Sequence, residues 1–255
     1  SIASHISELY LSEPVDESYF DEAHVPETED STQDHYLSNE TIQFTWPKEC
    51  LELIRLARPQ VEAIAKAMID EIREDRPVIG LTSCMPGDGC TTLLLAAAKF
   101  LLDSGVRVAM VDANFYNPIL DRQLDVASDC GWIETALQGE PVDRAVIESE
   151  IEEGALIPFC GSTIPESDGT LDMDFFGQYL DQLRDLYDIV LIDMGQFETG
   201  GSQSPVWNSE TGRAIDSVMI VHNLKSTSQE ELDMVREIVR QTGLQEMGIA
   251  ENFAV

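Results

Sequence analysis

The sequence is poor in basic residues. Fifteen lysines and arginines stand against 48 aspartates and glutamates in 255 positions, which gives a formal net charge of −33. The lysines among them are Lys48, Lys66, Lys99 and Lys225. A field of this sign repels nucleic acid and anionic lipid, so the composition argues against non-specific binding to DNA or to a membrane surface. Two explanations of the acidity stay open: a hydrated surface adapted to salt, and a surface that faces a basic partner.

Long apolar runs and paired cysteines are also missing. The longest apolar stretch, residues 93–102, contains Lys99 and is shorter than the roughly 18 residues that a membrane helix needs. No basic flank followed by an apolar stretch stands near the first residue, so no signal peptide is expected. The five cysteines are scattered without a CxxC pair, which argues against a zinc site or a disulfide framework. We therefore expect a cytoplasmic protein with reduced thiols.

Residues 1–45 contain no lysine or arginine and are rich in Asp, Glu, Ser and Thr. A segment of this composition buries too little apolar surface to order itself. We therefore expect a disordered acidic tail or linker over 1–45 and a folded domain over 46–255. Three tail tyrosines lie near acidic residues and are either phosphorylation sites or aromatic anchors: Tyr10, Tyr19 and Tyr36.

Apolar periodicity begins after Trp46. One helical face is indicated by residues spaced three and four apart, Val61, Ile64, Met68 and Ile72, with Pro59 interrupting its earlier part. Short apolar runs then alternate with helical patterns, as in parallel strands covered on both faces. The expected strands are 77–83, 106–112, 155–159, 188–193, 217–222 and 247–251, and the expected helices are 90–104, 172–187 and 227–242. This alternation predicts an α/β fold with a doubly wound, mainly parallel sheet flanked by helices.

A glycine-rich turn follows the first of these strands. Residues 84–92 read Cys-Met-Pro-Gly-Asp-Gly-Cys-Thr-Thr and lead into a helix. Such a turn aims backbone N–H groups at one point, and the helix dipole adds positive charge there, which is how phosphate is held. The P-loop pattern G-x-x-x-x-G-K-[ST] is met at Gly89 and Thr91, whereas Cys84 and Cys90 replace its first glycine and its lysine. A tight turn without a ligand is the other interpretation.

The nucleotide site predicted from this turn consists of Pro86, Gly87, Asp88, Gly89, Cys90, Thr91 and Thr92. The cysteines that bracket it have two interpretations. A thiol at a helix start has a lowered pKa in principle, which would allow a redox switch between Cys84 and Cys90. The alternative, which we favour, is that both are small residues that fill space.

Two aspartates end strands at the same predicted edge of the sheet. Asp112 ends VAMVD and Asp193 ends IVLID. At the carboxyl edge of a parallel sheet, one carboxylate can hold magnesium through water while the other orients a nucleophile. We therefore predict catalytic roles for both aspartates, and a magnesium site formed by them with Thr91. Either aspartate alone would also serve as a cap at a strand end.

The order and spacing of these motifs resemble the cytoplasmic domain of bacterial polysaccharide-biosynthesis tyrosine autokinases, within the MinD/ParA-like class of P-loop proteins. The resemblance covers residue 46 onward. It is carried by SCMPGDGCTT at 83–92, VAMVDANFYNP at 108–118, GWIETALQGEPVDRAV at 131–146 and YDIVLIDMGQ at 187–196. It implies a P-loop NTPase fold, ATP or ADP with Mg²⁺ as cofactors, and self-association. It also implies a membrane polysaccharide chain-length regulator as partner, which would bring the protein to the inner membrane.

Several positions depart from the family pattern, and they bear on whether the protein binds ATP and acts as a kinase. Cys90 stands at the lysine position, Asn114 and Tyr116 replace the second acidic and the basic residue of the middle motif, and Gly195-Gln196 replaces a proline pair. No tyrosine cluster, the autophosphorylation substrate of relatives, follows the core. A charge-assisted hydrogen bond to phosphate contributes about 1.5–3 kcal/mol, so loss of the lysine weakens binding about ten- to a hundredfold.

Three functions follow from this pattern. The first is a degenerate regulatory or scaffold protein with weak or absent ATP binding, a pseudo-kinase. The second is an active ATPase or tyrosine autokinase that takes its missing base from Lys225, Arg213 or a partner, with the tail tyrosines as substrates. The third is a ParA/MinD-type spatial organiser, against which the net charge argues.

Overall fold

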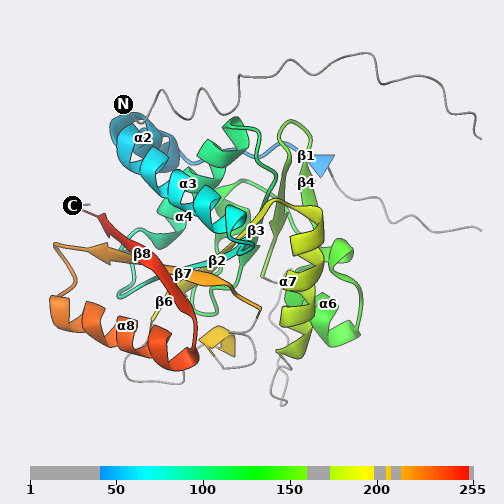
Figure 1. The fold of residues 1–255 in the computed structure, drawn as a ribbon. Helices are drawn as coiled ribbons and strands as arrows, with labels where there is room; N and C mark the ends of the chain where they lie inside the picture. The colour runs from blue at the N-terminus through cyan, green and yellow to red at the C-terminus, as the bar shows by residue number, and fades with distance from the viewer. Residues whose placement is uncertain (1–40, 160–172, 198–204, 208–213, 253–255) are drawn as a thin grey trace, which may run out of the picture. The chain divides into compact units, whose positions relative to one another are not determined.

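A mainly parallel sheet forms the centre of the domain (Figure 1). The structure is a computed structural model, and it describes residues 41–159, 173–197, 205–207 and 214–252. Its strands are β1 (Thr41–Ile42), β2 (Val78–Ser83), β3 (Val108–Asp112), β4 (Ile147–Ser149), β5 (Gly154–Ile157), β6 (Ile189–Gln196), β7 (Ser217–Asn223) and β8 (Gln245–Asn252). Within these ranges the strand order is β1-β4-β5-β3-β6-β2-β7-β8, and every pair is parallel except β4 with β5.

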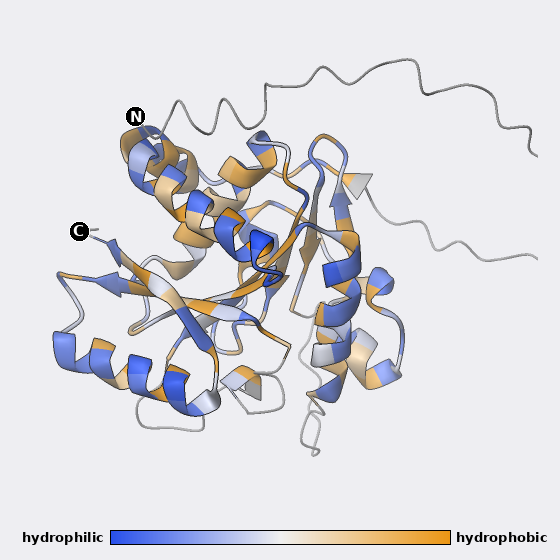
Figure 2. Cartoon of the chain, viewed as in Figure 1, coloured by the Kyte–Doolittle hydropathy of each residue, from blue (hydrophilic) through white to orange (hydrophobic). Residues whose placement is uncertain are grey.

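Helices cover both faces of the sheet, as the alternating pattern predicted. They are α2 (Lys48–Leu56), α3 (Arg58–Arg73), α4 (Cys90–Asp103), α5 (Leu120–Gln123), α6 (Trp132–Gln138), α7 (Asp174–Leu186) and α8 (Gln229–Thr242), with 3-10 turns at Val142–Ala145 and Pro205–Trp207. One apolar core packs beneath α6, α7 and α8, and a second packs beneath α2, α3 and α4. Figure 2 shows the apolar residues gathered in the strands and in α4, and polar residues along α8. No helix in the described ranges combines the length and apolarity needed to cross a bilayer.

The helix predicted from its apolar spacing is α3. Val61 and Met68 are buried, α3 packs against α2 and α4, and Pro59 lies in the first turn of this helix. A proline is tolerated there because the N–H groups of a first turn have no intrahelical acceptor. The interruption expected at Pro59 is therefore the junction at Ala57 between α2 and α3.

The described domain begins before residue 46, inside the segment assigned by composition to the tail. Thr41 and Ile42 pair with Glu148 and Ser149 of β4. Phe44 is 5% exposed and belongs to the core beneath α2, α3 and α4. Composition alone could not show this, because two backbone pairings and one buried ring are sufficient to hold a short polar segment on the sheet. The rest of the expected tail, residues 1–40 with its tyrosines, lies outside the described residues.

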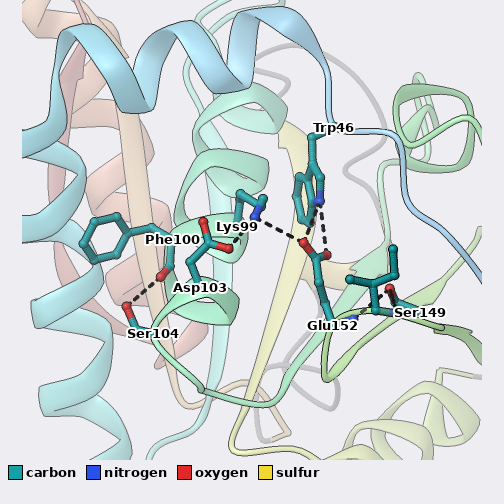
Figure 3. A network of polar contacts seen from close by, with 8 residues as sticks. Trp46, Lys99, Phe100, Asp103, Ser104, Ser149 and Glu152 are labelled. Carbon is teal, nitrogen blue, oxygen red and sulfur yellow. Dashed lines mark hydrogen bonds and ion pairs between the residues drawn. The ribbon is translucent and has the colours of Figure 1, made fainter. Parts of the chain in front are cut away.

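A polar network ties the start of the domain to α4 (Figure 3). The Trp46 indole N–H donates to both carboxylate oxygens of Glu152, at 3.2 and 3.1 Å. Lys99 pairs with Glu152 at 3.2 Å and also with Asp103, and its ammonium lies 5.8 Å from the centre of the Trp46 ring. Lys99 thereby links α4, the helix that follows the glycine-rich turn, to the turn between β4 and β5.

Candidate nucleotide-binding site

Three adjacent strands bring the predicted site residues to one edge of the sheet. β6 lies between β3 and β2, and its register places Asp193 beside Asp112. The same strand pairs Gln196 with Ser83, the last residue of β2 before the glycine-rich turn. The turn and both aspartates therefore meet at the carboxyl ends of parallel strands, where α/β sheets bind ligands.

The glycine-rich turn has the backbone shape of a phosphate-binding loop. Gly87 and Gly89 have φ values of 84° and 95°, in the left-handed region that favours glycine. Gly89 precedes the first residue of α4, and no side chain caps this helix. The N–H groups of its first turn therefore have no acceptor within the helix, which suits an anion. A Cβ atom at Gly89 would lie 2.6 Å from Asn252 Nδ2, so close packing also requires glycine there.

Thr91 and Asp193 lie in direct contact. The Thr91 hydroxyl donates to Asp193 Oδ2 at 2.5 Å, and the Gly195 N–H donates to Oδ1 at 2.9 Å. Asp193 is fully buried, and this burial raises its pKa, against the effect of these two donors. A hydroxyl and a carboxylate side by side are oxygen ligands of the kind that Mg²⁺ takes. The structure thus brings two of the three predicted magnesium ligands together, and their metal role stays a prediction.

The side chain of Cys90 points into the protein interior. It is 6% exposed, and its Sγ lies 3.9 Å from Asp193 Oδ1. Burial raises its pKa well above the usual thiol value, and the charge of Asp193 adds to the increase. Burial also raises the pKa of Cys84 to about 12. The lowered pKa considered for a thiol at the start of a helix is therefore wrong here, because burial and nearby carboxylates raise the pKa of both cysteines.

The side chain of Asp88 is directed toward the loop after β7. Its fully buried carboxylate accepts hydrogen bonds from the hydroxyls of Ser226 and Thr227, at 2.9 to 3.1 Å, and from the Met85 N–H at 2.9 Å. Its backbone carbonyl accepts a hydrogen bond from Asn252 Nδ2 at 2.7 Å. Asp88, predicted as a nucleotide contact, thus joins the turn to the loop after β7. Of the other predicted contacts, Pro86 and Gly87 are exposed, and Thr92 is half-buried.

Asp112 organises the loop that follows β3. One carboxylate oxygen accepts hydrogen bonds from the N–H groups of Ile119 and Leu120, at 2.8 and 2.9 Å, and the other accepts from Asn114 N–H at 3.1 Å. Its own carbonyl oxygen accepts from the Trp132 indole at 2.7 Å. Burial, with the nearby charge of Asp193, raises the pKa of Asp112 to about 7 despite these backbone donors. Its predicted catalytic and metal roles stay predictions.

This raised pKa predicts that folding stability falls as the pH rises from about 4 to 7. Below 3.8, the ordinary value, Asp112 is protonated in both the folded and the unfolded states. Between 3.8 and about 7 the folded state binds the extra proton, so unfolding releases it. We expect this residue to lower the free energy of unfolding by up to about 1.4 kcal/mol per pH unit in that window, and to add no slope above it.

The measurement is denaturant unfolding at half-unit steps from pH 4.5 to 8, on the natural chain and on Asp112→Asn. The asparagine does not titrate in this range, so the difference between the two curves reports Asp112 together with its electrostatic interaction with Asp193. A difference that stays constant over the window would show that the pKa of Asp112 is not raised.

Two departures from the family pattern contact each other. Asn114 Oδ1 accepts hydrogen bonds from the N–H groups of Tyr116 and Asn117, at 3.2 and 3.0 Å. A Cβ atom at Gly195, whose φ is 67°, would collide with the Asn114 amide. The glycine that replaces a proline near the end of β6 therefore makes room for the asparagine that replaces an acid after β3.

Of the two candidate replacement bases, the structure describes Lys225 but not Arg213. Lys225 is exposed in the loop after β7, and its backbone N–H donates to Asn223 Oδ1 at 3.0 Å. The next two residues contact Asp88, so this loop lies against the glycine-rich turn. Arg213 lies outside the described residues.

Ser226, Thr227 and Asn252 belong to this edge and were not predicted from the sequence. All three lie at or just after the carboxyl ends of β7 and β8; β7 is next to β2 in the sheet, and β8 is next to β7. The rule that loops after parallel strands share one edge was the signal available for them.

The backbone of the site fits a phosphate better than its side chains do. The turn supplies glycines in the required conformation and an uncapped helix start. Its surroundings are three buried carboxylates, Asp88, Asp112 and Asp193, and residues 84–92 contain no lysine or arginine. The residues present therefore fit an anion through backbone N–H groups, and the cation that would neutralise it has to come from outside the turn.

Comparisons with known proteins point to one class. The family model described as "Cellulose biosynthesis protein BcsQ" matches residues 77–229. The chain is 18% identical over 180 residues to tyrosine-protein kinase CpsD of Streptococcus agalactiae, which covers 70% of this chain and 75% of that protein.

Solved structures share the fold. The kinase domain of the Escherichia coli tyrosine kinase ETK matches with a TM-score of 0.65 and 18% identity, over 75% of this chain and 73% of that one. The septum site-determining protein MinD from Pyrococcus horikoshii, complexed with Mg-ADP, matches with a TM-score of 0.55 and 19% identity, over 67% and 68% of the two chains. The predicted fold and the resemblance to tyrosine kinases within the MinD/ParA-like class are thereby confirmed.

Proposed function

The chain belongs to the family of the cellulose biosynthesis protein BcsQ, and from this premise we propose that it is a degenerate P-loop protein that regulates or scaffolds polysaccharide assembly and binds ATP weakly or not at all. The names of the relatives support a role in polysaccharide biosynthesis, and the residues of the site support a degenerate P-loop. A fold shared with kinases and with MinD does not by itself transfer their activity.

The observation that carries this proposal is the position of Cys90. It stands at the lysine position of the P-loop pattern, is buried, and faces Asp193 at 3.9 Å. A thiol with a raised pKa brings no positive charge to a triphosphate. The three buried acidic side chains around the turn bring no positive charge either, and each one that is ionised repels a triphosphate, because like charges in a buried site are weakly screened.

We expect isothermal calorimetry on the natural chain to show no binding of ATP or ADP, or binding weaker than about 100 μM, which corresponds to about −5.5 kcal/mol. Titrations are run with and without Mg²⁺, and Asp193→Asn serves as the comparison because it removes the carboxylate charge beside Thr91. Micromolar binding that requires Mg²⁺ and is lost in Asp193→Asn would contradict the proposal.

The alternative function is an active ATPase or tyrosine autokinase with a relocated base. The contact between Asp88 and the loop that carries Lys225 favours it. Under this alternative, Mg²⁺-dependent ATP turnover is present in the natural chain and is lost in Lys225→Ala. Replacing the exposed Lys48 by alanine is the control, and turnover is expected to persist there.

The relatives also suggest partners. We propose self-association and a membrane polysaccharide chain-length regulator that holds the protein at the cytoplasmic face of the inner membrane. Leu51 and Leu56 of α2 are 46% and 69% exposed, which makes this helix a source of apolar contacts for either partner.

A further inference from the structure

The glycine-rich turn is held in place by a set of contacts that involves no phosphate. The carboxylate of Asp88 is fully buried, and three donors converge on it: the hydroxyls of Ser226 and Thr227 and the N–H of Met85. A buried carboxylate is tolerated only when such donors replace its hydration. The shape of the turn is thus tied to residues about 140 positions away in the chain.

The loop that provides these donors is itself well fixed. The N–H groups of Ser226 and Thr227 donate to the Asn223 carbonyl at 3.2 and 2.9 Å, and the Leu224 N–H donates to the Asn252 carbonyl at 3.0 Å. The Asn252 side chain returns to the turn and donates to the Asp88 carbonyl at 2.7 Å. Loop 223–228, the end of β8 and the turn therefore form one hydrogen-bonded unit.

Lys225 lies in the middle of this unit. It directly precedes Ser226, is exposed, and has its backbone N–H bound by Asn223 Oδ1 at 3.0 Å. Among the described residues, the other lysines belong to α2, α3 and α4, at positions 48, 66 and 99, and each is in an ion pair there. Lys225 is accordingly the described lysine whose backbone is fastened next to the phosphate-binding turn.

We propose that Asp88 is a positioning residue: its carboxylate fastens loop 223–228 to the turn and thereby places Lys225 where it supplies a cation to a polyphosphate bound there. This rests on the weak-binding form of the proposed function, in which the turn still accepts phosphate, and it uses the lysine that the alternative function names as its base. Asp88 contributes through its hydroxyl partners and does not touch the ligand. Lys225 contributes charge that Cys90 does not.

The first experiment tests the fastening without any ligand. Amide hydrogen exchange is followed by mass spectrometry in peptides that cover 84–92 and 223–228. The variants are Asp88→Ala and the double variant Ser226→Ala/Thr227→Val, which keeps the carboxylate and removes its hydroxyl donors. In both variants, the amides of both peptides are expected to exchange at least tenfold faster than in the natural chain, whereas exchange in residues 108–112 is unchanged. Asp233→Ala, which removes an exposed carboxylate from α8, is the matched charge control.

The second experiment tests whether Asp88 acts through Lys225. Affinity for Mg²⁺-ATP and for inorganic tripolyphosphate is measured in a Cys90→Lys background, in which binding is strong enough to quantify. Asp88→Ala and Lys225→Ala are each expected to weaken binding about tenfold, and their combination is expected to weaken it no further than either alone. Asp88→Asn, which keeps the shape of the side chain, guards against a variant that fails to fold.

The outcomes separate this inference from the proposed function. Unchanged exchange in 223–228 overturns the fastening, and a double variant whose losses multiply overturns action through Lys225. In both cases the degenerate P-loop assignment stands, provided that the Cys90→Lys protein binds. If that protein does not bind, the lost lysine is not what limits the turn and the role of Lys225 fails, and hydrogen exchange alone decides whether Asp88 fastens the loop.

Discussion

Replacing Cys90 by lysine is expected to raise the affinity for Mg²⁺-ATP about ten- to a hundredfold above that of the natural chain. The turn already has the backbone conformation of a phosphate-binding loop, with glycines at positive φ and an uncapped helix start. A lysine at this position would bring an ammonium group beside Asp193, which lies 3.9 Å from the present thiol. The added charge offsets both the triphosphate and the buried carboxylates.

Calorimetry on the two proteins, with and without Mg²⁺, gives the comparison. Cys90→Met is the matched control, because it lengthens the side chain without adding charge and is expected to leave the affinity low. A lysine variant that folds normally and binds no better than the methionine variant would show that the missing charge is not what limits this site.

Replacing Trp132 by alanine is expected to lower the free energy of unfolding by about 3–5 kcal/mol. Its ring is 1% exposed and contacts a set of aromatic rings, with centroid distances of 4.5 Å to Phe176, 5.7 Å to Phe159 and 5.9 Å to Phe115. The indole N–H also donates to the Asp112 carbonyl at 2.7 Å. The alanine leaves a large cavity and an unpaired carbonyl at the carboxyl end of β3.

Trp132→Phe separates these two contributions. It keeps an aromatic ring in the cluster and removes the donor to Asp112, so we expect a loss of about 1–3 kcal/mol. Denaturant unfolding at pH 7 measures both variants. An alanine variant within about 1 kcal/mol of the natural chain would show that the cluster relaxes to fill the space, and that Trp132 does not hold the end of β3.

Much of the fold could be predicted from the sequence because its cause is local. The apolar runs that became β2, β3, β6 and β7 had to be buried on both faces, and the predicted helices α4, α7 and α8 pack on the strands. The short elements were harder to predict. β1 and β4 have two and three residues, too few for any periodicity, and only pairing with a neighbouring strand makes them strands.

By itself, the sequence determined the glycine-rich turn, the missing lysine at Cys90, and the placement of Asp112 and Asp193 at strand ends. Those features follow from residue identity and spacing. Only the tertiary structure decided where the side chains point. Asp88 turned out to face Ser226 and Thr227, and the thiol of Cys90 turned out to have a raised pKa. Burial and contacts between residues more than 100 positions apart set these properties, and no local pattern encodes them.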